Sequence, residues 1–214
     1  MKCLMAEVNF SEGRDQGLID QVRDAMLAGD PIDLMEIASD ADHNRTVFTF
    51  KGEPRAVLEA SKRLSAKAVE LIDMTKHSGA HPRIGAVDVV PFIPVKDVTI
   101  DEALEICREY GKFMGELGVP VYYYEDAATS EERKSLPKIR KGQYEGLEEK
   151  MKDPAWKPDE AALAALGLDD PDRITVTYDD GSYTLLLGDT DESGNYYGQL
   201  EGSYQVGLLS PGYV

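Results

Sequence analysis

The order in which short apolar strands and longer amphipathic helices alternate restricts the fold of this chain more than any other sequence feature. Residues 4–10 predict a strand, and apolar residues then recur at helical spacing until a Gly-Asp-Pro break at residues 29–31. Residues 32–37 and 46–50 predict two strands around a polar turn, followed by a long helix and a strand at residues 87–95. The resulting order βαββαβ is typical of an antiparallel sheet that carries both helices on one face.

Later segments extend this core. Pro91 and Pro94 predict an edge or bulged strand at residues 87–95, and a helix around Cys107 precedes a predicted strand at residues 119–124. The predicted fold class is therefore α/β, in detail an α+β sandwich. It has a ferredoxin-like βαββαβ core with a mixed sheet and helices on one face, plus a small C-terminal β unit. One face of the sheet is expected to be uncovered.

The chain changes character after residue 159. A short helix rich in Ala and Leu is predicted first, and residues 173–178 and 182–187 then read as a hairpin joined by an Asp-Asp-Gly turn. This last part of the sequence is strongly acidic. We therefore predict two domains, residues 1–159 and residues 160–214.

Composition narrows the class of protein. The 214 residues are 42% hydrophobic, enough for one substantial core. Cys3 and Cys107 support neither a disulfide framework nor a cysteine metal site. The net charge of −17 opposes nucleic acid or an anionic membrane as a partner, and no segment approaches the ~20 apolar residues of a membrane span. The N-terminus does not read as a secretory signal, so a cytoplasmic location is expected.

Residues 77–88, with the sequence HSGAHPRIGAVD, hold two of the three histidines between a predicted helix and a predicted strand. Gly79, Pro82 and Gly85 oppose a continued helix, so the segment is predicted to be a shaped loop. Loops held by rigid elements concentrate catalytic and binding residues. We therefore expect the chemistry of the protein here.

His81 is the candidate general acid and base in this loop, because a neutral imidazole accepts and returns a proton near pH 7. Arg83 offers a planar fork for a substrate carboxylate. The alternative is that His81 only braces the loop. His77 and His81 have the spacing of zinc ligands on a helix, but the loop denies them that helix, so no metal is expected.

Three polar turns supply the remaining candidates: Asn9, Ser11 and Glu12; Asp40, Asp42 and His43; Asn44 and Arg45. Each has a simpler reading. The first is a helix N-cap at Ser11, the second a solvated turn, and the third a surface ion pair. Glycine-rich phosphate-binding motifs are missing from the sequence, which argues against a nucleotide enzyme.

Six sequence blocks, in order, closely resemble the N-terminal subdomain of the glutamate formiminotransferase family. They lie at residues 9–13, 40–47, 71–74, 77–88, 91–94 and 136–147. The resemblance covers about residues 2–159 and ends in a Trp-x-Pro-Asp stretch at residues 156–159. The family's second α/β subdomain, which forms the other wall of a folate tunnel, is not recognised after residue 159.

The resemblance implies transfer of a formimino group from N-formimino-L-glutamate to N5 of the co-substrate tetrahydrofolate, in histidine degradation and one-carbon metabolism. The family's catalytic histidine corresponds to His81, which would remove the N5 proton and protonate the departing glutamate nitrogen. Arginine forks would hold carboxylates, and aspartates would stabilise a formamidinium cation or orient the imidazole. The expected substrate-binding residues are Arg83, Arg45, Asn44, His43, Asp40, Asp42 and Asp88. The expected cofactor-binding residues are Asn9, Ser11 and Glu12.

Because the second subdomain, which forms half of the family's pocket, is not recognised here, three functions remain open for this chain. The first is a transferase whose pocket is completed by a second copy, a partner chain or the tail. The second is a non-catalytic folate- or glutamate-binding or regulatory subunit, and the third is a subunit whose bare sheet face binds a partner. The polar combination of His81, Arg83, His43 and Arg45 favours the first two. A homodimer or a partner chain over the exposed sheet face is expected in each case.

Overall fold

The computed structural model describes residues 2–160, 172–178, 181–190, 196–200 and 206–209. The chain divides into two compact units. The first comprises Met1–Gly111 and Tyr122–Lys157, and the second comprises Lys112–Val121 and Pro158–Val214. The two domains expected from the sequence, residues 1–159 and 160–214, stay a prediction.

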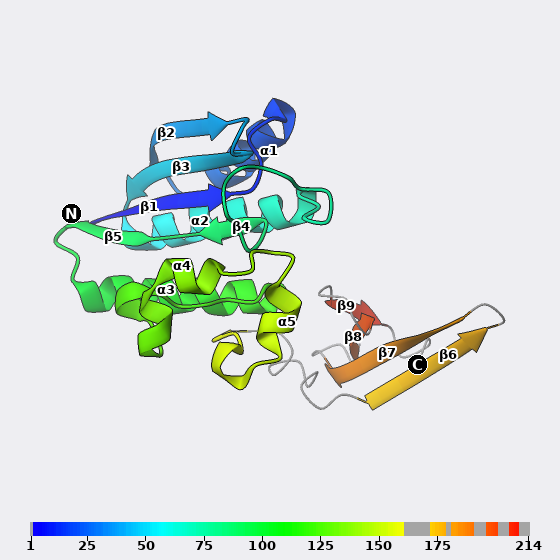
Figure 1. The fold of residues 1–214 in the computed structure, drawn as a ribbon. Helices are drawn as coiled ribbons and strands as arrows, with labels where there is room; N and C mark the ends of the chain where they lie inside the picture. The colour runs from blue at the N-terminus through cyan, green and yellow to red at the C-terminus, as the bar shows by residue number, and fades with distance from the viewer. Residues whose placement is uncertain (1, 161–171, 179–180, 191–195, 201–205, 210–214) are drawn as a thin grey trace. The chain divides into compact units, whose positions relative to one another are not determined.

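The first unit is built on a five-stranded sheet (Figure 1). Its strands are β1 (Cys3–Phe10), β2 (Asp33–Asp40), β3 (Arg45–Gly52), β4 (Val87–Val89) and β5 (Phe92–Lys96). The order is β2-β3-β1-β4, with β5 also paired to β1. This order confirms the α+β class and the ferredoxin-like core.

The sheet is antiparallel in every described pairing, which corrects the expectation of a mixed sheet. β1 and β2 are both antiparallel to β3, so they run in the same direction. β3 lies between them, and no parallel pair forms.

The two prolines of residues 87–95 act as predicted. Pro91 separates β4 from β5, and both pieces pair with β1 along one edge of the sheet, with shifts in register. Pro94 lies within β5 opposite Leu4. Proline has no N–H to donate to a neighbouring strand, so this position suits an edge strand, which has a neighbour on one side only.

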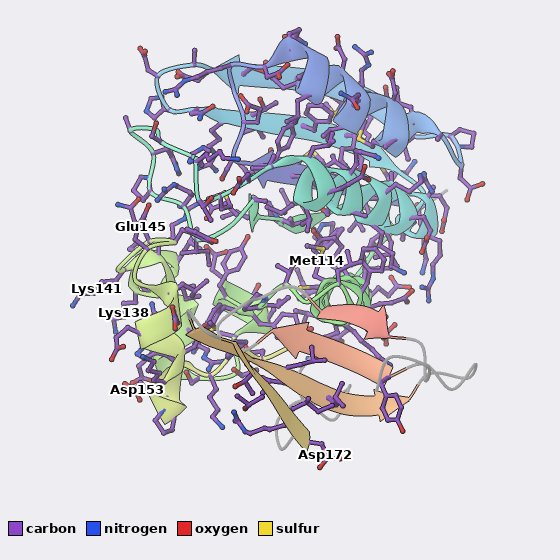
Figure 2. The ribbon with its side chains drawn as sticks, turned by 90° about the vertical axis from the view of Figure 1, so that its right-hand side faces the viewer. Met114, Lys138, Lys141, Glu145, Asp153 and Asp172 are labelled. Carbon is purple, nitrogen blue, oxygen red and sulfur yellow. The ribbon has the colours of Figure 1, made fainter. Side chains whose placement is uncertain are left out.

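Helices α1 (Gln16–Leu27) and α2 (Pro54–Leu71) lie on one face of the sheet (Figures 1 and 2). Alternate residues of β1 point to this face and are completely buried: Leu4, Ala6, Val8 and Phe10. Asp15 caps α1 by accepting a hydrogen bond from the Leu18 N–H, so the cap is not at Ser11. A third helix, α3 (Ile100–Glu116), follows β5, and Tyr110 on it is hydrogen-bonded to Ser65 of α2.

The intervening residues of the central strands point to the opposite, open face. Asn9 of β1 pairs with Val47 of β3, and side chains two residues apart on a strand share a face. Arg45, two residues before Val47, therefore projects on the same side as Asn9. The register of two strands thus places an amide and a guanidinium together on the open face.

The strand predicted at residues 119–124 does not form. Within the described residues this stretch makes one isolated bridge, Val121 to Glu160, because Pro120 supplies no N–H to a ladder. Tyr122 instead packs with Ile139 and Leu147 in a small satellite core.

Short helices occupy the segment that follows. They are η1 (Glu125–Ala127), η2 (Glu131–Lys134), α4 (Leu136–Arg140), α5 (Leu147–Met151) and η3 (Pro154–Trp156). The hydroxyl of Tyr122 donates to the Trp156 carbonyl at 2.8 Å and so fixes the end of this segment to its beginning.

The second unit contains an antiparallel sheet in the order β6-β7-β8-β9. Its strands are β6 (Asp172–Tyr178), β7 (Gly181–Thr190), β8 (Tyr196–Leu200) and β9 (Val206–Leu209). The pairing of β6 with β7 confirms the predicted hairpin strands, whereas β8 and β9 were not assigned from the sequence. Turn residues 179–180 and the predicted helix after residue 160 lie outside the described residues. Among the described helices, none combines the length and apolar character needed to span a bilayer.

Candidate functional site

A small, partly open hollow gathers residues from four separate stretches of the first unit. It lies where β1 and β4 meet the turn before β3 and the loop at residues 77–83. Its lining residues are Ser11, His43, Asn44, Arg45, His77, His81, Arg83 and Asp88. Seven of these eight are residues that the sequence predicts for the site; the eighth, His77, was considered only as a metal ligand. The fold therefore brings the separate polar turns together.

His81 is half-buried at the centre of this group. Its Nδ1 lies 2.6 Å from the Pro82 carbonyl oxygen, and the Arg45 guanidinium donates to the ring. A carbonyl only accepts, so Nδ1 carries the proton and Nε2 accepts from Arg45. Burial, followed by the positive charge of Arg45, lowers the pKa of His81 below its ordinary value. This shift favours the neutral imidazole, which is the form a general base requires.

Arg45 is held from two sides at the start of β3. Its Nε donates to Asn9 Oδ1 at 3.1 Å, and its Nη1 lies 3.9 Å from Asp88 Oδ2. Asn9 is itself fixed, because its Nδ2 donates to the backbone oxygens of Glu7 at 2.8 Å and Val89 at 3.2 Å. In this structure Asn9 orients Arg45, and its predicted contact with the cofactor stays a prediction.

Asp88 is the most deeply buried charge of the site, with 2% of its side chain exposed. Its Oδ1 accepts the Ile84 N–H at 3.0 Å, and its Oδ2 pairs with Nη2 of Arg140. Arg140 was not among the predicted site residues, although the sequence block that contains it was recognised. A carboxylate buried this deeply needs a cation, but its burial is seen only in the structure, so no local sequence pattern pointed to Arg140.

Arg83 fastens the loop to the segment between α4 and α5. Its Nη1 and Nη2 donate to the two carboxylate oxygens of Glu145 at 2.9 and 2.6 Å, and Nη1 also donates to Gln143 Oε1 at 3.0 Å. Its Nε and Nη2 donate to His77 Nδ1 and the His77 carbonyl. All five N–H groups of Arg83 therefore have protein acceptors. The carboxylate-binding role predicted for Arg83 stays a prediction.

The Arg83 pair gives Glu145 a distinctive pH dependence. Arg83 lowers the pKa of Glu145 from its ordinary 4.5 to about 2. A depressed folded-state pKa stabilises the protein above the unfolded-state value, and this contribution is lost as the pH falls toward 2. We expect Glu145→Gln to cost under about 1 kcal/mol at pH 7, because the carboxylate is 64% exposed, and to cost less at pH 3.

Urea unfolding of wild type and Glu145→Gln at pH 7 and pH 3 measures this difference. Glu148→Gln, which changes an exposed carboxylate on α5, is the matched control. A cost that is equal at both pH values would contradict the pairing of Glu145 with Arg83.

Asn44 connects three loops at the rim of the hollow. Its Oδ1 accepts the Gly13 N–H at 2.9 Å, its Nδ2 donates to the Ser78 carbonyl at 3.0 Å, and its own carbonyl accepts from His77 Nε2. The residue adopts a left-handed φ of 50°, which asparagine tolerates better than most residues. Its side chain is thus engaged by the chain itself, and its predicted contact with substrate stays a prediction.

The turn before β3 is exposed. Asp40 Oδ1 accepts the backbone N–H of His43 at 2.8 Å, and these hydrogen bonds lower the pKa of Asp40. The carbonyl of Asp42 accepts the Ala80 N–H at 3.1 Å. The His43 ring lies 6.0 Å from the His81 ring, so the turn brings a second imidazole to the hollow.

Ser11 and Glu12 shape the neighbouring turn. The Ser11 hydroxyl donates to the Gly85 carbonyl at 2.8 Å, and its backbone N–H donates to the Ala86 carbonyl at 2.8 Å. Glu12 accepts the Arg14 and Asp15 N–H groups. These contacts attach the loop to β1; the cofactor contacts predicted for both residues stay predictions.

Gly79 is required where the loop crosses the turn before β3. A Cβ at this position would lie 2.2 Å from the His43 carbonyl oxygen. Gly79→Ala must therefore displace the loop that carries His81, and we expect it to cost about 1 to 3 kcal/mol in the free energy of unfolding. Urea unfolding measures this cost. Gly17→Ala on the exposed side of α1 is the control and should not lower the free energy of unfolding, whereas wild-type stability of Gly79→Ala would contradict the close approach.

Within the described part of the chain, no cluster of three or more His, Cys, Asp or Glu side chains is placed to bind a metal ion. Both ring nitrogens of His77 are already used, one by Arg83 and one by the Asn44 carbonyl. His77 therefore acts as a link between the loop and its surroundings. The zinc-like spacing of His77 and His81 does not place them as a ligand pair.

Comparison with known proteins adds independent information. Residues 3–165 match the family model for the N-terminal subdomain of the formiminotransferase domain. The chain is 47% identical over 152 residues to glutamate formimidoyltransferase of Streptococcus pyogenes serotype M1, covering 71% of this chain and 51% of that protein.

Two further relatives give the same match. Formimidoyltransferase-cyclodeaminase of Dictyostelium discoideum is 47% identical over 152 residues, with 71% of this chain and 28% of the relative covered. Glutamate formimidoyltransferase of Thermoplasma acidophilum is 42% identical over 154 residues, with 71% and 51% covered. The matched part of this chain thus corresponds to about half of each glutamate formimidoyltransferase and to 28% of the cyclodeaminase.

Proposed function

Because this chain belongs to the formiminotransferase family, we propose that it supplies the histidine-bearing wall of a formimino-transfer site. The donor is N-formimino-L-glutamate and the acceptor is N5 of tetrahydrofolate. The observation that carries this proposal is the half-buried imidazole of His81, which contacts the fixed guanidinium of Arg45 in a hollow lined by polar side chains.

The reaction needs one proton removed and one delivered. N5 of tetrahydrofolate attacks the amidine carbon and forms a tetrahedral intermediate. Nε2 of His81 takes the N5 proton and then gives a proton to the glutamate nitrogen, so the bond from carbon to that nitrogen breaks and glutamate leaves. A single imidazole can perform both transfers because the ordinary pKa of histidine lies near neutral pH, so the ring both accepts and returns a proton.

Arg45 occupies the accepting face of His81 in this structure. Substrate must therefore take one hydrogen bond from Arg45 before Nε2 can accept the N5 proton. A substrate carboxylate is the natural exchange partner for the guanidinium, because a charge-assisted pair is stronger than a bond to a neutral ring. His43 lines the exposed side of the same hollow. Together with Asp40 and Asp42 of the same turn, it would contact the formamidinium group.

The hollow is small for these substrates. The free space inside it is about 10 Å³, which is room for about one water molecule, so a second wall is needed to enclose these substrates. We infer that a second copy of this chain or a partner chain covers the open sheet face, a homodimer being the simplest case. The free Cys3 and Cys107 suit the reducing cytoplasm, where we place the reaction.

A turnover assay with N-formimino-L-glutamate and tetrahydrofolate, read from the absorbance of the folate product, tests the proposal. Calorimetric titration of each ligand on the same sample separates binding from chemistry. Turnover supports the transferase. Binding of either ligand without turnover supports instead a non-catalytic folate- or glutamate-binding subunit, and the absence of both contradicts the two readings.

A further inference from the structure

Two arginines share the buried carboxylate of Asp88, and only Arg45 hydrogen-bonds to His81. Nη2 of Arg140 donates to Asp88 Oδ2, while Nη1 of Arg45 lies 3.9 Å from the same oxygen. The other oxygen, Oδ1, is taken by the Ile84 N–H at 3.0 Å. One carboxylate oxygen is therefore shared unequally between two cations.

This unequal sharing leaves Arg45 available to its other partners. Its remaining hydrogen bonds go to Asn9 Oδ1 and to the His81 ring. If Arg140 were absent, Asp88, which is 2% exposed, would draw the guanidinium of Arg45 from 3.9 Å to about 2.8 Å, the length of a charge-assisted hydrogen bond. Arg45 would then move away from the imidazole by about the difference.

We propose that Arg140 is a positioning residue for His81: by pairing with Asp88 it keeps the guanidinium of Arg45 on the imidazole ring. Arg140 does not touch the ring itself in any described hydrogen bond. Its place at the C-terminal end of α4 is secured by the neighbouring contacts of the Arg83 loop, where the Tyr144 N–H donates to the Arg83 carbonyl at 2.9 Å.

The charged groups that face His81 determine the sign of the effect. They are Arg45 from β3, Arg140 from α4, Asp88 from β4 and His43 from the turn before β3. Both arginines lower the pKa of His81, and Asp88 raises it. Removing Arg140 removes one cation and draws the second toward Asp88, so both consequences raise the pKa of His81.

Histidine NMR titration of the full chain tests this without any need for turnover. The Cε1–H signals are assigned with single His→Gln variants of the three histidines. In Arg140→Met the His81 titration should move upward by roughly half a pH unit or more. Lys141→Met is the matched control, because Lys141 is an exposed neighbour that projects from the outer side of this segment (Figure 2), and it should leave the titration unchanged.

If Arg140→Met does not fold, Arg140→Gln provides the same test with an uncharged polar side chain. An unchanged His81 titration in a folded Arg140→Met or Arg140→Gln protein would overturn the proposal. Arg140→Lys retains a charge beside Asp88 and should shift the titration less than either.

Kinetics connect the positioning role to the reaction, and this part rests on the proposed function. In Arg140→Met the acidic limb of the kcat/KM profile should move upward in pH, and kcat at pH 7 should fall on the order of 10-fold to 100-fold. Partial recovery in Arg140→Lys is expected. A shifted NMR titration in a protein without turnover supports the positioning role and contradicts only the proposed transferase function. Wild-type kcat in Arg140→Met overturns the positioning role.

Discussion

Replacing His81 by alanine is expected to remove the proposed formimino transfer while the fold remains intact. The side chain is half-buried in the hollow and contributes to none of the backbone ladders, so its loss leaves the sheet and helices in place. General acid and base catalysis contributes about 10²-fold to 10⁴-fold, and we expect kcat to fall by that factor. Stopped-assay turnover and thermal unfolding of the same preparation measure the two properties separately.

Free imidazole provides the control for this variant. Small imidazole enters a site enlarged by His81→Ala and should restore part of the rate, with the dependence on pH that the base form of free imidazole dictates. Wild-type turnover in His81→Ala would remove this residue as the proton-transfer group. Loss of turnover together with unfolding would indicate a bracing role instead.

Replacing Asp88 by alanine should produce the largest loss of stability among single changes at the site. The carboxylate is 2% exposed and pairs with Arg45 and Arg140, whose side chains are 18% and 17% exposed. Removing one partner of a buried pair leaves charge without compensation. Because water reaches both arginines in part, we expect a cost of about 2 to 4 kcal/mol in the free energy of unfolding.

Urea unfolding measures this cost as a lower midpoint with an unchanged slope. Asp88→Asn keeps the acceptor for the Ile84 N–H and should be less destabilising than the alanine variant. Asp33→Ala is the control, because Asp33 forms an exposed pair with Lys51 at 3.4 Å and should cost under about 0.5 kcal/mol. Equal costs for Asp88→Ala and Asp33→Ala would contradict the buried pairing.

The order of elements in the core could be predicted because it depends on local periodicity. The alternation in β1, the helical spacing in α1 and α2, and the two prolines near β5 are all visible within a few residues. The strand predicted at residues 119–124 failed for a local reason that was also visible. Pro120 removes a donor where the apolar pattern alone indicated a strand.

The site could be predicted in part for the same reason. Glycine and proline mark residues 77–88 as a loop, and the chemistry of imidazole singles out His81. The chemistry of the Arg83 side chain alone suggested a fork for a substrate carboxylate, and that role stays a prediction. The structure gives all five of its N–H groups acceptors in the chain, chiefly Glu145, which no local pattern connects to it.

The sequence by itself determined which residues are buried in the core and that residues 77–88, which include His81, form a loop, because hydrophobic periodicity and backbone restrictions act over short distances. Only the tertiary structure decided which charges meet. Asp88 and Arg140 are 52 positions apart, and Arg83 and Glu145 are 62 positions apart. An ion pair between distant segments leaves no repeating pattern in the sequence. Its partners therefore become known only when packing brings α4 and the turn that follows it against the loop.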